Sequence, residues 1–517
     1  MKRFLLCGVC LLFIVLPLRA DPAAAKIVQN AWDAAYLEGA KAGYFHTLVQ
    51  EIDQAGRKVY RTTLTMNMAI KRYNAVVPLR MEIGSEETAD GKVLGLSLTQ
   101  VLDKGRMVQT ARVEEGKLLF QSGESEAKTL PWQDDVVGPY YAERLFQIKK
   151  VKPGDKFDYR NYELSLLRSV VVHVDVKGEE EIDLLQPAKK GGKLVLVKRK
   201  LLRAESKSDK VEINGVNVPL PRMVHWLNDQ REIARSEMEL PGLGKVALYR
   251  TSRAIAQVEG AAPALMPDLG LSTLIPLNRR INRPHDARTV TYRITIQGDD
   301  DPGTAFAQDA RQTVRKVEGN TLELLVKAVK KPAAKENPAA ADPEFLKSSY
   351  FLDSKDERVR ELARTAVDRE TDPLKKARLI EKWVHANMQS SSSIGFATAG
   401  QIARDLEGDC RQHAMLAAGM CRAAGVAART AIGLVYVDDP QRGPVLGFHM
   451  WTEVWIDGQW LGLDATLGQG GIGSGHLKIS SPSWNDTQTL APLLQVTRVI
   501  GKMKAEIVRV TVPKKTN

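Results

Sequence analysis

Hydrophobic and polar residues alternate over much of the first half of the chain. Leu, Met or Ile occupies every second position across residues 64–70, and Leu does so again across residues 94–98. Successive side chains of a strand point to opposite faces of its sheet, so this period of two predicts strands with one buried face. Asn214-Gly215, between two short β-prone runs, predicts a hairpin turn. We therefore expect residues 24–270 to form a β-rich antiparallel domain, curved or closed, with few helices.

The period of the hydrophobic residues changes in the second half of the chain. Helical periodicity is present in residues 356–368, 373–388 and 410–424. Asp409 is a favourable N-cap for the last of these helices, and Gly425 is placed to end it. Small residues at helical spacing along this last helix predict that one of its faces lies unusually close to its neighbour.

Two strands are predicted after these helices. Alternation in residues 448–456 indicates the first strand, and Asp457-Gly458 is a strong hairpin signal before the second, residues 459–466. A two-residue turn at this point places His449 and Asp464 on one face of the hairpin as diagonal neighbours. A slip of one residue would put them on opposite faces.

The remaining segments set the domain boundaries. We interpret residues 271–344 as a short β segment followed by a linker rich in Lys, Pro and Ala. Residues 345–500 contain the predicted helices and hairpin and form a second domain of α+β class. Residues 501–517 form a tail or a further strand.

The composition is that of an ordinary globular protein. The 517 residues are 44% hydrophobic and 26% charged, and 74 basic against 62 acidic residues give a formal net charge of +12. Because the basic excess is spread along the chain, it favours a solvated surface over a site for nucleic acid. The sequence has no glycine-rich phosphate loop, paired-cysteine metal motif or recognition helix. We expect no nucleic-acid partner, no metal and no cofactor.

The first twenty residues have the pattern of a secretory signal peptide. Met1-Lys2-Arg3 is basic, residues 4–18 are apolar, and Leu18-Arg19-Ala20 offers a small-residue cleavage site. No other segment approaches the apolar length of a membrane-spanning helix. We expect residues 1–20 to be removed and the mature protein, without a transmembrane segment, to be exported to the periplasm or outside the cell.

Cys410, His449 and Asp464 are the residues best suited to chemistry. A thiol becomes a strong nucleophile when a nearby base takes its proton, and that imidazole needs a partner on its second nitrogen. The positive end of the helix dipole would also favour a thiolate at Cys410. An isolated cysteine is more often a core residue, and we interpret Cys421, on the same helix, in that way. His413, one turn after Cys410, is an alternative base that is less well aimed.

In order and spacing, these residues resemble the transglutaminase-like superfamily. The resemblance rests on Gly408-Asp409-Cys410, on the end of the Cys helix at residues 422–429, on His449-Met450-Trp451, and on Trp460 with Asp464-Ala465-Thr466. It implies a papain-like α+β fold in which the Cys helix packs on an antiparallel sheet. It also implies acyl transfer from amides through a thioester, with Cys410 as nucleophile, His449 as base and Asp464 as the partner that orients the base.

Trp451 and Gln401 are further candidates for the substrate site. Trp451 shares the alternation of His449, so it is placed to line a substrate groove, with core packing as the alternative. The backbone N–H of Cys410 is a natural donor to a developing oxyanion, and Gln401 is the nearest upstream polar candidate for a second donor. The serine-rich residues 390–393 predict a flexible loop beside the same cleft.

We therefore expect an exported, cysteine-dependent acyl-transfer enzyme that acts on peptide or glutamine amides in the cell envelope. Hydrolysis is favoured slightly over transamidation, because water is abundant and no sequence feature indicates a groove that holds an amine and excludes water. The alternative is a non-catalytic envelope binding or scaffold protein that keeps the fold. The three intact residues argue against this alternative, since a scaffold needs none of them.

Overall fold

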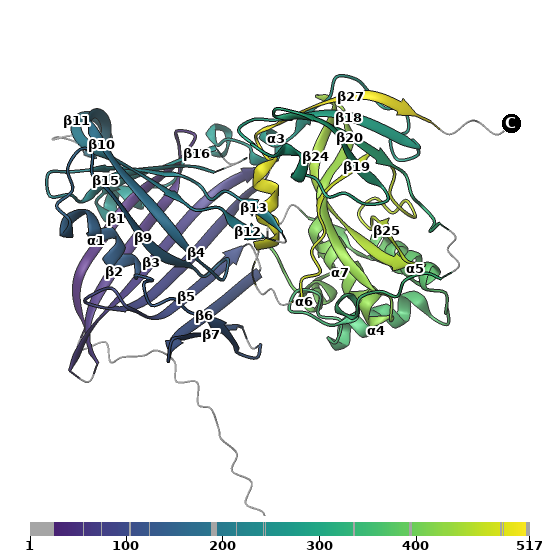
Figure 1. Ribbon diagram of the computed structural model, residues 1–517, viewed down its shortest axis with the longest axis horizontal. Coiled ribbons are helices and arrows are strands. Elements are labelled where there is room, and N and C mark those ends of the chain that lie inside the picture. Colours follow the sequence, from purple (N-terminus) through teal and green to yellow (C-terminus); the bar gives the residue numbers. More distant parts are fainter. Residues whose placement is uncertain are drawn as a thin grey trace, which may run out of the picture.

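The structure of the protein is a computed structural model (Figure 1). It describes residues 25–512 apart from 55, 74, 103–104, 124, 188–193, 214, 241, 243, 334–336, 392–394, 486–488 and 490. The predicted signal peptide, residues 1–20, lies outside the described residues.

The N-terminal part is built around a large antiparallel sheet with the strand order β8-β7-β6-β5-β4-β3-β2-β1-β16-β15-β14-β11-β10-β9 (Figure 1). The prediction of a β-rich antiparallel domain is therefore confirmed. Asn214 of the predicted Asn214-Gly215 turn lies outside the described residues, and the strands on either side of it, β12 and β13, form a separate antiparallel pair. The strand bounds are β1 (Lys26–Leu37), β2 (Ala40–Gln54), β3 (Arg57–Arg72), β4 (Ala75–Thr88), β5 (Val93–Leu102), β6 (Gly105–Glu114), β7 (Lys117–Ser122), β8 (Lys128–Pro131), β9 (Lys156–Glu163), β10 (Arg168–Pro187), β11 (Leu194–Ser208), β12 (Val211–Ile213), β13 (Val216–Val218), β14 (Met223–Leu227), β15 (Ile233–Leu240) and β16 (Gly244–Thr251).

Helix α1 (Pro139–Ile148) shows that this sheet is curved. Its Phe146 packs in a core cluster with residues of β10 and β11, whereas its Tyr140 ring lies 5.1 Å from Tyr60 of β3. Strand β3 is far from β10 and β11 in the order of the sheet. The sheet must therefore bend around α1 for the helix to contact all three strands. Glu87 of β4 accepts hydrogen bonds from the backbone N–H groups at the start of α1, and burial raises the pKa of its carboxyl to about 7.

The C-terminal part contains two further sheets. One has the order β17-β24-β23-β26, with β25 paired to β24, and the other has the order β19-β20-β18-β27. The two sheets enclose a shared core that includes Val290, Leu322 and Leu446. Residues 271–344, interpreted from sequence as a connection, thus contribute strands to this fold. The strand bounds are β17 (Ile275–Pro276), β18 (Thr289–Ile296), β19 (Gln312–Glu318), β20 (Thr321–Lys327), β23 (Ala428–Asp439), β24 (Gly443–Ile456), β25 (Gln459–Leu463), β26 (His476–Ser480) and β27 (Met503–Thr511).

The predicted helices are present and pack on one face of the β24 sheet (Figure 1). They are α4 (Glu357–Val367), α5 (Pro373–Asn387) and α7 (Cys410–Ala423), together with the shorter α6 (Ala399–Asp405). The small residues of α7 allow a close approach: the Thr452 hydroxyl on β24 donates to the backbone carbonyl of Ala414, with 3.0 Å between the oxygens. Helix α7 is buried along most of its length, because α4, α5 and α6 cover the side that β24 does not.

The predicted register of the β24–β25 hairpin is confirmed. Ile456 pairs with Gln459, and the ladder continues to Thr452 opposite Leu463. The strand itself is longer than predicted, because β24 begins at Gly443, five residues before Phe448. Residues 443–447 pair with β23 and β17, so their strand conformation comes from neighbours that are distant in sequence.

The two parts are linked by short elements and touch through a 3₁₀ helix. After β16 come α2 (Arg253–Ala256), η2 (Pro263–Leu265) and α3 (Leu269–Ser272); η3 (Pro302–Thr304), η4 (Pro343–Leu346) and the short strands β21 (Gln389–Ser390) and β22 (Glu407–Gly408) lie further along the chain. Helix η5 (Ala491–Arg498) packs on the β12–β13 pair, and its Gln495 amide donates to the carbonyl of Ile213 across 2.8 Å (Figure 1).

Among the described residues, none of the helices combines the length and apolar character needed to span a membrane.

Candidate active site

Cys410 is the first residue of α7, and its position is fixed by a capping box. The Asp409 carboxylate accepts from the N–H of Arg411 at 2.9 Å, and the Gln412 side chain accepts from the N–H of Asp409 at 3.1 Å. The predicted N-cap is therefore confirmed. Cys410 is half-buried, whereas residues 412–422 of α7 are buried.

His449 and Asp464 form a buried hydrogen-bonded pair beside the N-terminal end of α7. The Nε2 of His449 donates to Oδ2 of Asp464 across 2.7 Å, and the two side chains are 7% and 1% exposed. Because Nε2 is engaged, Nδ1 is the ring nitrogen left to face the Cys410 thiol. Burial acts to lower the pKa of His449, but the Asp464 charge and the hydrogen-bonded Cys410 outweigh it and raise that pKa well above its usual value.

The Asp464 carboxylate is held by the turn that follows β25. Its Oδ1 accepts from the N–H groups of Thr466 and Leu467 at 3.0 and 3.2 Å. Its own backbone N–H donates to Oε1 of Glu381, a buried residue of α5, at 3.0 Å. Although burial opposes ionisation, the hydrogen-bonded histidines keep the pKa of Asp464 well below its usual range. The carboxylate is therefore charged and fixed in orientation.

His476, on β26, is part of this site and was not predicted from the sequence. Its Nε2 donates to the same Oδ2 of Asp464 across 2.9 Å, and its side chain is 1% exposed. Burial lowers the pKa of His476 to about 4, so the ring is neutral near pH 7. No local signal marks this residue, because it reaches Asp464 only through the pairing of β26 with β23.

The ligand atoms of His449, Asp464 and His476 lie within 4.8 Å of one another, a spacing that a metal ion could bridge. Both histidine Nε2 atoms point at one carboxylate oxygen and each donates a proton to it. A metal would have to displace both of these hydrogen bonds and the His449 ring from the thiol. The donor set therefore fits a hydrogen-bond network better than a metal centre.

Asp409 is bound by arginines from both parts of the chain. Nη1 of Arg72, the last residue of β3, lies 2.7 Å from Oδ2 of Asp409, and Nη2 of Arg411 lies 2.8 Å from the same oxygen. Burial alone would raise the pKa of Asp409, but the two guanidinium groups hold it below its usual value. The N-terminal domain thus contacts the residue that caps the Cys410 helix. No local pattern in the sequence predicts this contact.

Trp451 lies on the predicted face of β24 but does not line a groove. It has no exposed surface and packs with Ala431 and Ile472. Gly433, on the neighbouring strand β23, makes room for the ring, since a Cβ there would lie 2.9 Å from it. The assignment of Trp451 to substrate binding is therefore wrong, and core packing is its role: it supports His449, whose ring stacks 6.4 Å away.

Gln401 is placed at the start of α6 and faces solvent. Its Oε1 accepts from the N–H of Thr398 at 3.0 Å, while its own N–H donates to the Thr398 hydroxyl at 3.3 Å. This reciprocal capping box engages the side chain in local structure. The structure therefore gives Gln401 a capping role at α6.

The serine-rich loop, by contrast, adjoins the Cys410 turn. Ser390 pairs in parallel with Gly408, and the N–H of Ser391 donates to the carbonyl of Gly408 at 3.0 Å. Residues 392–394 lie outside the described residues.

Cys421 takes the structural role expected for it, and His413, the alternative base, also has a structural role. Cys421 is 1% exposed, and burial raises the pKa of its thiol. His413 is 3% exposed, and its Nδ1 donates to the carbonyl of Asp409 at 2.9 Å, so it fixes the first turn of α7. Burial lowers its pKa. His449 is thus the base candidate that the structure favours.

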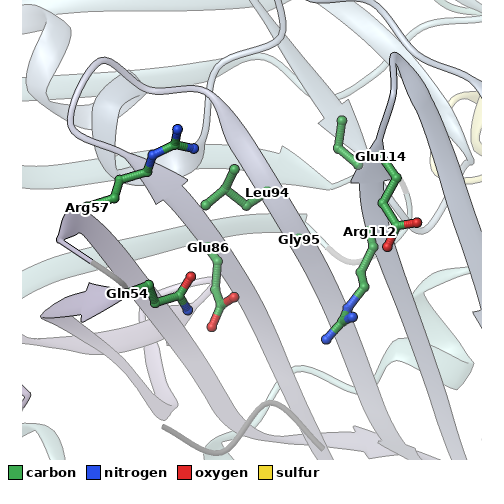
Figure 2. A pocket seen from close by; sticks show the side chains of 8 residues that line it. Gln54, Arg57, Glu86, Leu94, Gly95, Arg112 and Glu114 are labelled. Atoms are coloured by element: carbon green, nitrogen blue, oxygen red, sulfur yellow. The ribbon is translucent and has the colours of Figure 1, made fainter. Parts of the chain in front are cut away.

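A hollow on the N-terminal sheet, with a volume of about 540 Å³, lies among β2 to β6 (Figure 2). Its rim carries charged side chains of both signs: Arg57, Arg112, Glu86 and Glu114. Glu86 is engaged by Arg61, with Nε 2.8 Å from Oε1. The residues lining this hollow include no nucleophile, so we place the candidate chemistry at Cys410.

Residues 360–465 match the model of the transglutaminase-like superfamily. The C-terminal region thus carries a transglutaminase-like domain, as the resemblance in the sequence predicted, and this superfamily consists largely of cysteine-dependent enzymes. Comparison with curated protein sequences gives no significant match.

Solved structures similar to the chain are remote. A candidate cysteine protease of Cytophaga hutchinsonii is 16% identical, with 44% of this chain and 86% of that chain covered and a TM-score of 0.29. A β-barrel-like protein of Brucella abortus is 14% identical, with 43% and 95% covered and a TM-score of 0.31. A candidate protease of Parabacteroides distasonis is 9% identical, with 76% and 69% covered and a TM-score of 0.19. At these TM-scores, the structural likenesses carry no weight in assigning a function.

Proposed function

We propose that the protein is an exported cysteine-dependent acyl-transfer enzyme that cleaves peptide or glutamine amides in the cell envelope. The observation that carries the proposal is the buried pair of His449 and Asp464, 2.7 Å apart, beside a half-buried Cys410 at a helix N-terminus. The family match supports the same chemistry. Export rests on the signal-peptide pattern of residues 1–20.

The reaction begins with transfer of the Cys410 proton to Nδ1 of His449. Sγ of Cys410 then attacks the carbonyl carbon of the amide, forming a C–S bond and placing negative charge on the carbonyl oxygen. Cys410 is the first helical residue, so its backbone N–H has no acceptor within the helix and suits this oxyanion. As the tetrahedral intermediate collapses, His449 gives its proton to the nitrogen and the C–N bond breaks.

Asp464 serves this cycle by keeping the imidazole in one tautomer and stabilising it while it is charged. The raised pKa of His449 has the same origin, since Asp464 stabilises the imidazolium that pairs with the thiolate. The thioester is resolved when an acceptor attacks its carbonyl carbon, His449 removes the acceptor's proton, and the C–S bond breaks to restore the thiol. Water as acceptor gives hydrolysis, and an amine gives transamidation.

Hydrolysis is the acceptor reaction we favour. Transamidation requires a second groove that holds an amine and keeps water from the thioester, because water is present at roughly 55 M. Around Cys410, the nearby described segment 389–391 is polar and largely exposed. An exposed polar segment beside Cys410 does not keep water from the thioester, which favours hydrolysis.

The experiment incubates the mature protein with a library of glutamine-containing peptides and a labelled primary amine. We expect peptide cleavage or ammonia release to exceed incorporation of the label. Hydrolysis and label incorporation should both disappear in Cys410→Ala. Both should persist in Cys421→Ala, the matched control, which removes the other sulfur of the same helix. Incorporation of the amine that outpaces hydrolysis would replace the hydrolase by a transamidase, and turnover that survives Cys410→Ala would refute the proposal altogether.

A further inference from the structure

Two hairpins of the N-terminal sheet reach the part of the C-terminal domain that carries Cys410. Strands β3 to β6 are consecutive neighbours in the sheet, so the β3–β4 and β5–β6 turns lie at the same end of it. Arg72, beside the first turn, binds Asp409, and Met107, just after the second, packs against the core cluster that also borders Cys410. The contact with the catalytic domain is therefore shared by β3 and β6, near these two turns.

Tyr73, next to Arg72, is held in an unfavourable backbone conformation in this contact. Its φ of 54° lies in the left-handed region, which a bulky aromatic residue rarely adopts. Two contacts hold it there: its N–H donates to Oδ1 of Asp268 at 2.7 Å, and its ring lies so close to Gly270 that a Cβ there would be 2.9 Å away. Asp268 and Gly270, which follow the last strand of the N-terminal sheet, thus hold Tyr73 in place.

The Tyr73 side chain remains 43% exposed although it is braced from one side. The Arg72 guanidinium, which binds Asp409 next to Cys410, lies 5.6 Å from the centre of the Tyr73 ring, so the ring lies close to the start of α7. Burial raises the pKa of the Tyr73 hydroxyl, so the phenol is neutral near pH 7. An exposed aromatic ring that is fixed in place beside a nucleophile has a free surface for a substrate.

Phe396 adds a second aromatic ring at the same helix end. The guanidinium of Arg411, the residue after Cys410, lies 5.2 Å from the centre of the Phe396 ring. Phe396 is itself half-buried and packs on the core cluster that borders Cys410. Rings from the two domains therefore approach the start of α7, one by Arg72 and one by Arg411.

We propose that Tyr73 of the N-terminal domain and Phe396 form an aromatic subsite beside Cys410 that selects an aromatic side chain in the peptide substrate. The inference deepens the proposed function and rests on it. In this arrangement Arg72 is a positioning residue, which ties the turn carrying Tyr73 to the cap of the Cys410 helix. The β-rich domain then chooses the substrate directly, because one wall of the active site belongs to it.

The test uses two peptidyl acyloxymethyl ketones that differ only in having phenylalanine or alanine beside the reactive carbonyl. The Cys410 thiolate displaces the carboxylate of either probe and forms a stable thioether, so no natural substrate is needed. The rate of labelling is followed by intact mass on the full mature protein. We expect the wild-type protein to prefer the phenylalanine probe roughly tenfold, the size expected for burying one aromatic group against rings.

Tyr73→Ala should bring this ratio close to one, while Tyr73→Phe should keep it, because the ring and not the hydroxyl makes the contact. Val76→Ala is the matched control, since Val76 is an equally exposed apolar residue of the same hairpin, at 41%. The rate with iodoacetamide, which carries no peptide, should be the same in all four proteins.

An unchanged ratio in Tyr73→Ala would overturn the subsite. So would a faster reaction of that variant with iodoacetamide, which would make Tyr73 a cover over the thiol instead of a wall for the substrate. A wild-type protein that labels rapidly with iodoacetamide and prefers neither probe would also overturn it while leaving the proposed function intact. A wild-type Cys410 inert to all three reagents would instead refute the proposed function.

Discussion

Two buried carboxyl groups, Glu87 of the N-terminal domain and Asp464 of the C-terminal domain, are held in opposite charge states. In the N-terminal domain, Glu87 and His225 are each held by neutral partners, and burial moves their pKa values toward the uncharged form, to about 7 and about 4. In the C-terminal domain, Asp464 is as deeply buried, yet its pKa stays below the usual range because two histidines bind it. A buried charge that a protein keeps ionised is costly, and such groups concentrate at functional sites. The comparison therefore separates a supporting buried carboxyl, Glu87, from the one at the candidate active site, Asp464.

Removing the nucleophile should have the largest effect. Cys410→Ala should lower turnover by a factor on the order of 10⁴ or more, because the thioester can no longer form. Cys421→Ala on the same helix should keep most of the activity and lose stability instead, since Cys421 is buried in the core. Steady-state assays and thermal unfolding of both variants check this, and equal losses of activity would remove the distinction between the two sulfurs.

Neutralising the buried Asp464 carboxylate should have the second-largest effect on activity. Asp464→Asn should lower kcat by a factor on the order of 10³, because an amide cannot stabilise the imidazolium or hold both histidines as acceptor. Glu87→Gln is the matched change in the other domain, and it should leave kcat unchanged because the buried Glu87 carries its proton below pH 7. A loss of activity in Glu87→Gln as large as in Asp464→Asn would contradict the division of roles.

The second histidine on Asp464 should have a smaller and more diagnostic effect. His476→Phe should lower kcat about tenfold, in the range of supporting residues. It should also shift the alkaline limb of the pH–rate profile to higher pH. Asp464 would then bind His449 alone, so its charge would stabilise that imidazolium more and raise the pKa of the ring further. A lower rate with an unchanged pH profile would mean that His476 serves packing only.

The smallest of the predicted effects is on the free energy of unfolding, which should depend on pH through buried groups of the N-terminal domain. The pKa of His225 is lowered on folding, so its contribution to stability is lost as pH falls from 6.5 to about 4, at a cost of about 3 kcal/mol. The pKa of Glu87 is raised, so its contribution is lost as pH rises from 4.5 to about 7. Denaturant unfolding of His225→Asn and Glu87→Gln across pH 4–8 should flatten the acid and neutral limbs respectively. Parallel curves for wild type and variants would refute both assignments.

Local signals in the sequence were sufficient for the helix and hairpin that carry Cys410, His449 and Asp464. Asp409 and Gly425 mark the ends of α7, and Asp457-Gly458 sets the register of the hairpin. These features act over a few residues, so they can be interpreted without knowledge of the fold.

What the sequence could not supply depends on contacts between distant segments. Alternation placed Trp451 on the face of His449, but it could not tell that Ala431 and Ile472 cover that face. His476 joins the site only because β26 pairs with β23. Arg72 reaches Asp409 from 337 residues away, across a domain boundary.

The central claim is that Cys410 is an activated nucleophile and Cys421 is not, and competitive alkylation tests it most directly. Native mature protein is treated with a limiting amount of iodoacetamide at pH 7, and peptide mass spectrometry gives the share of label on each cysteine. The account predicts that nearly all label falls on Cys410, that the rate drops in His449→Ala, and that Cys421 reacts only after denaturation. Slow and equal labelling of the two cysteines, appearing only when the protein unfolds, would contradict it and favour the scaffold alternative.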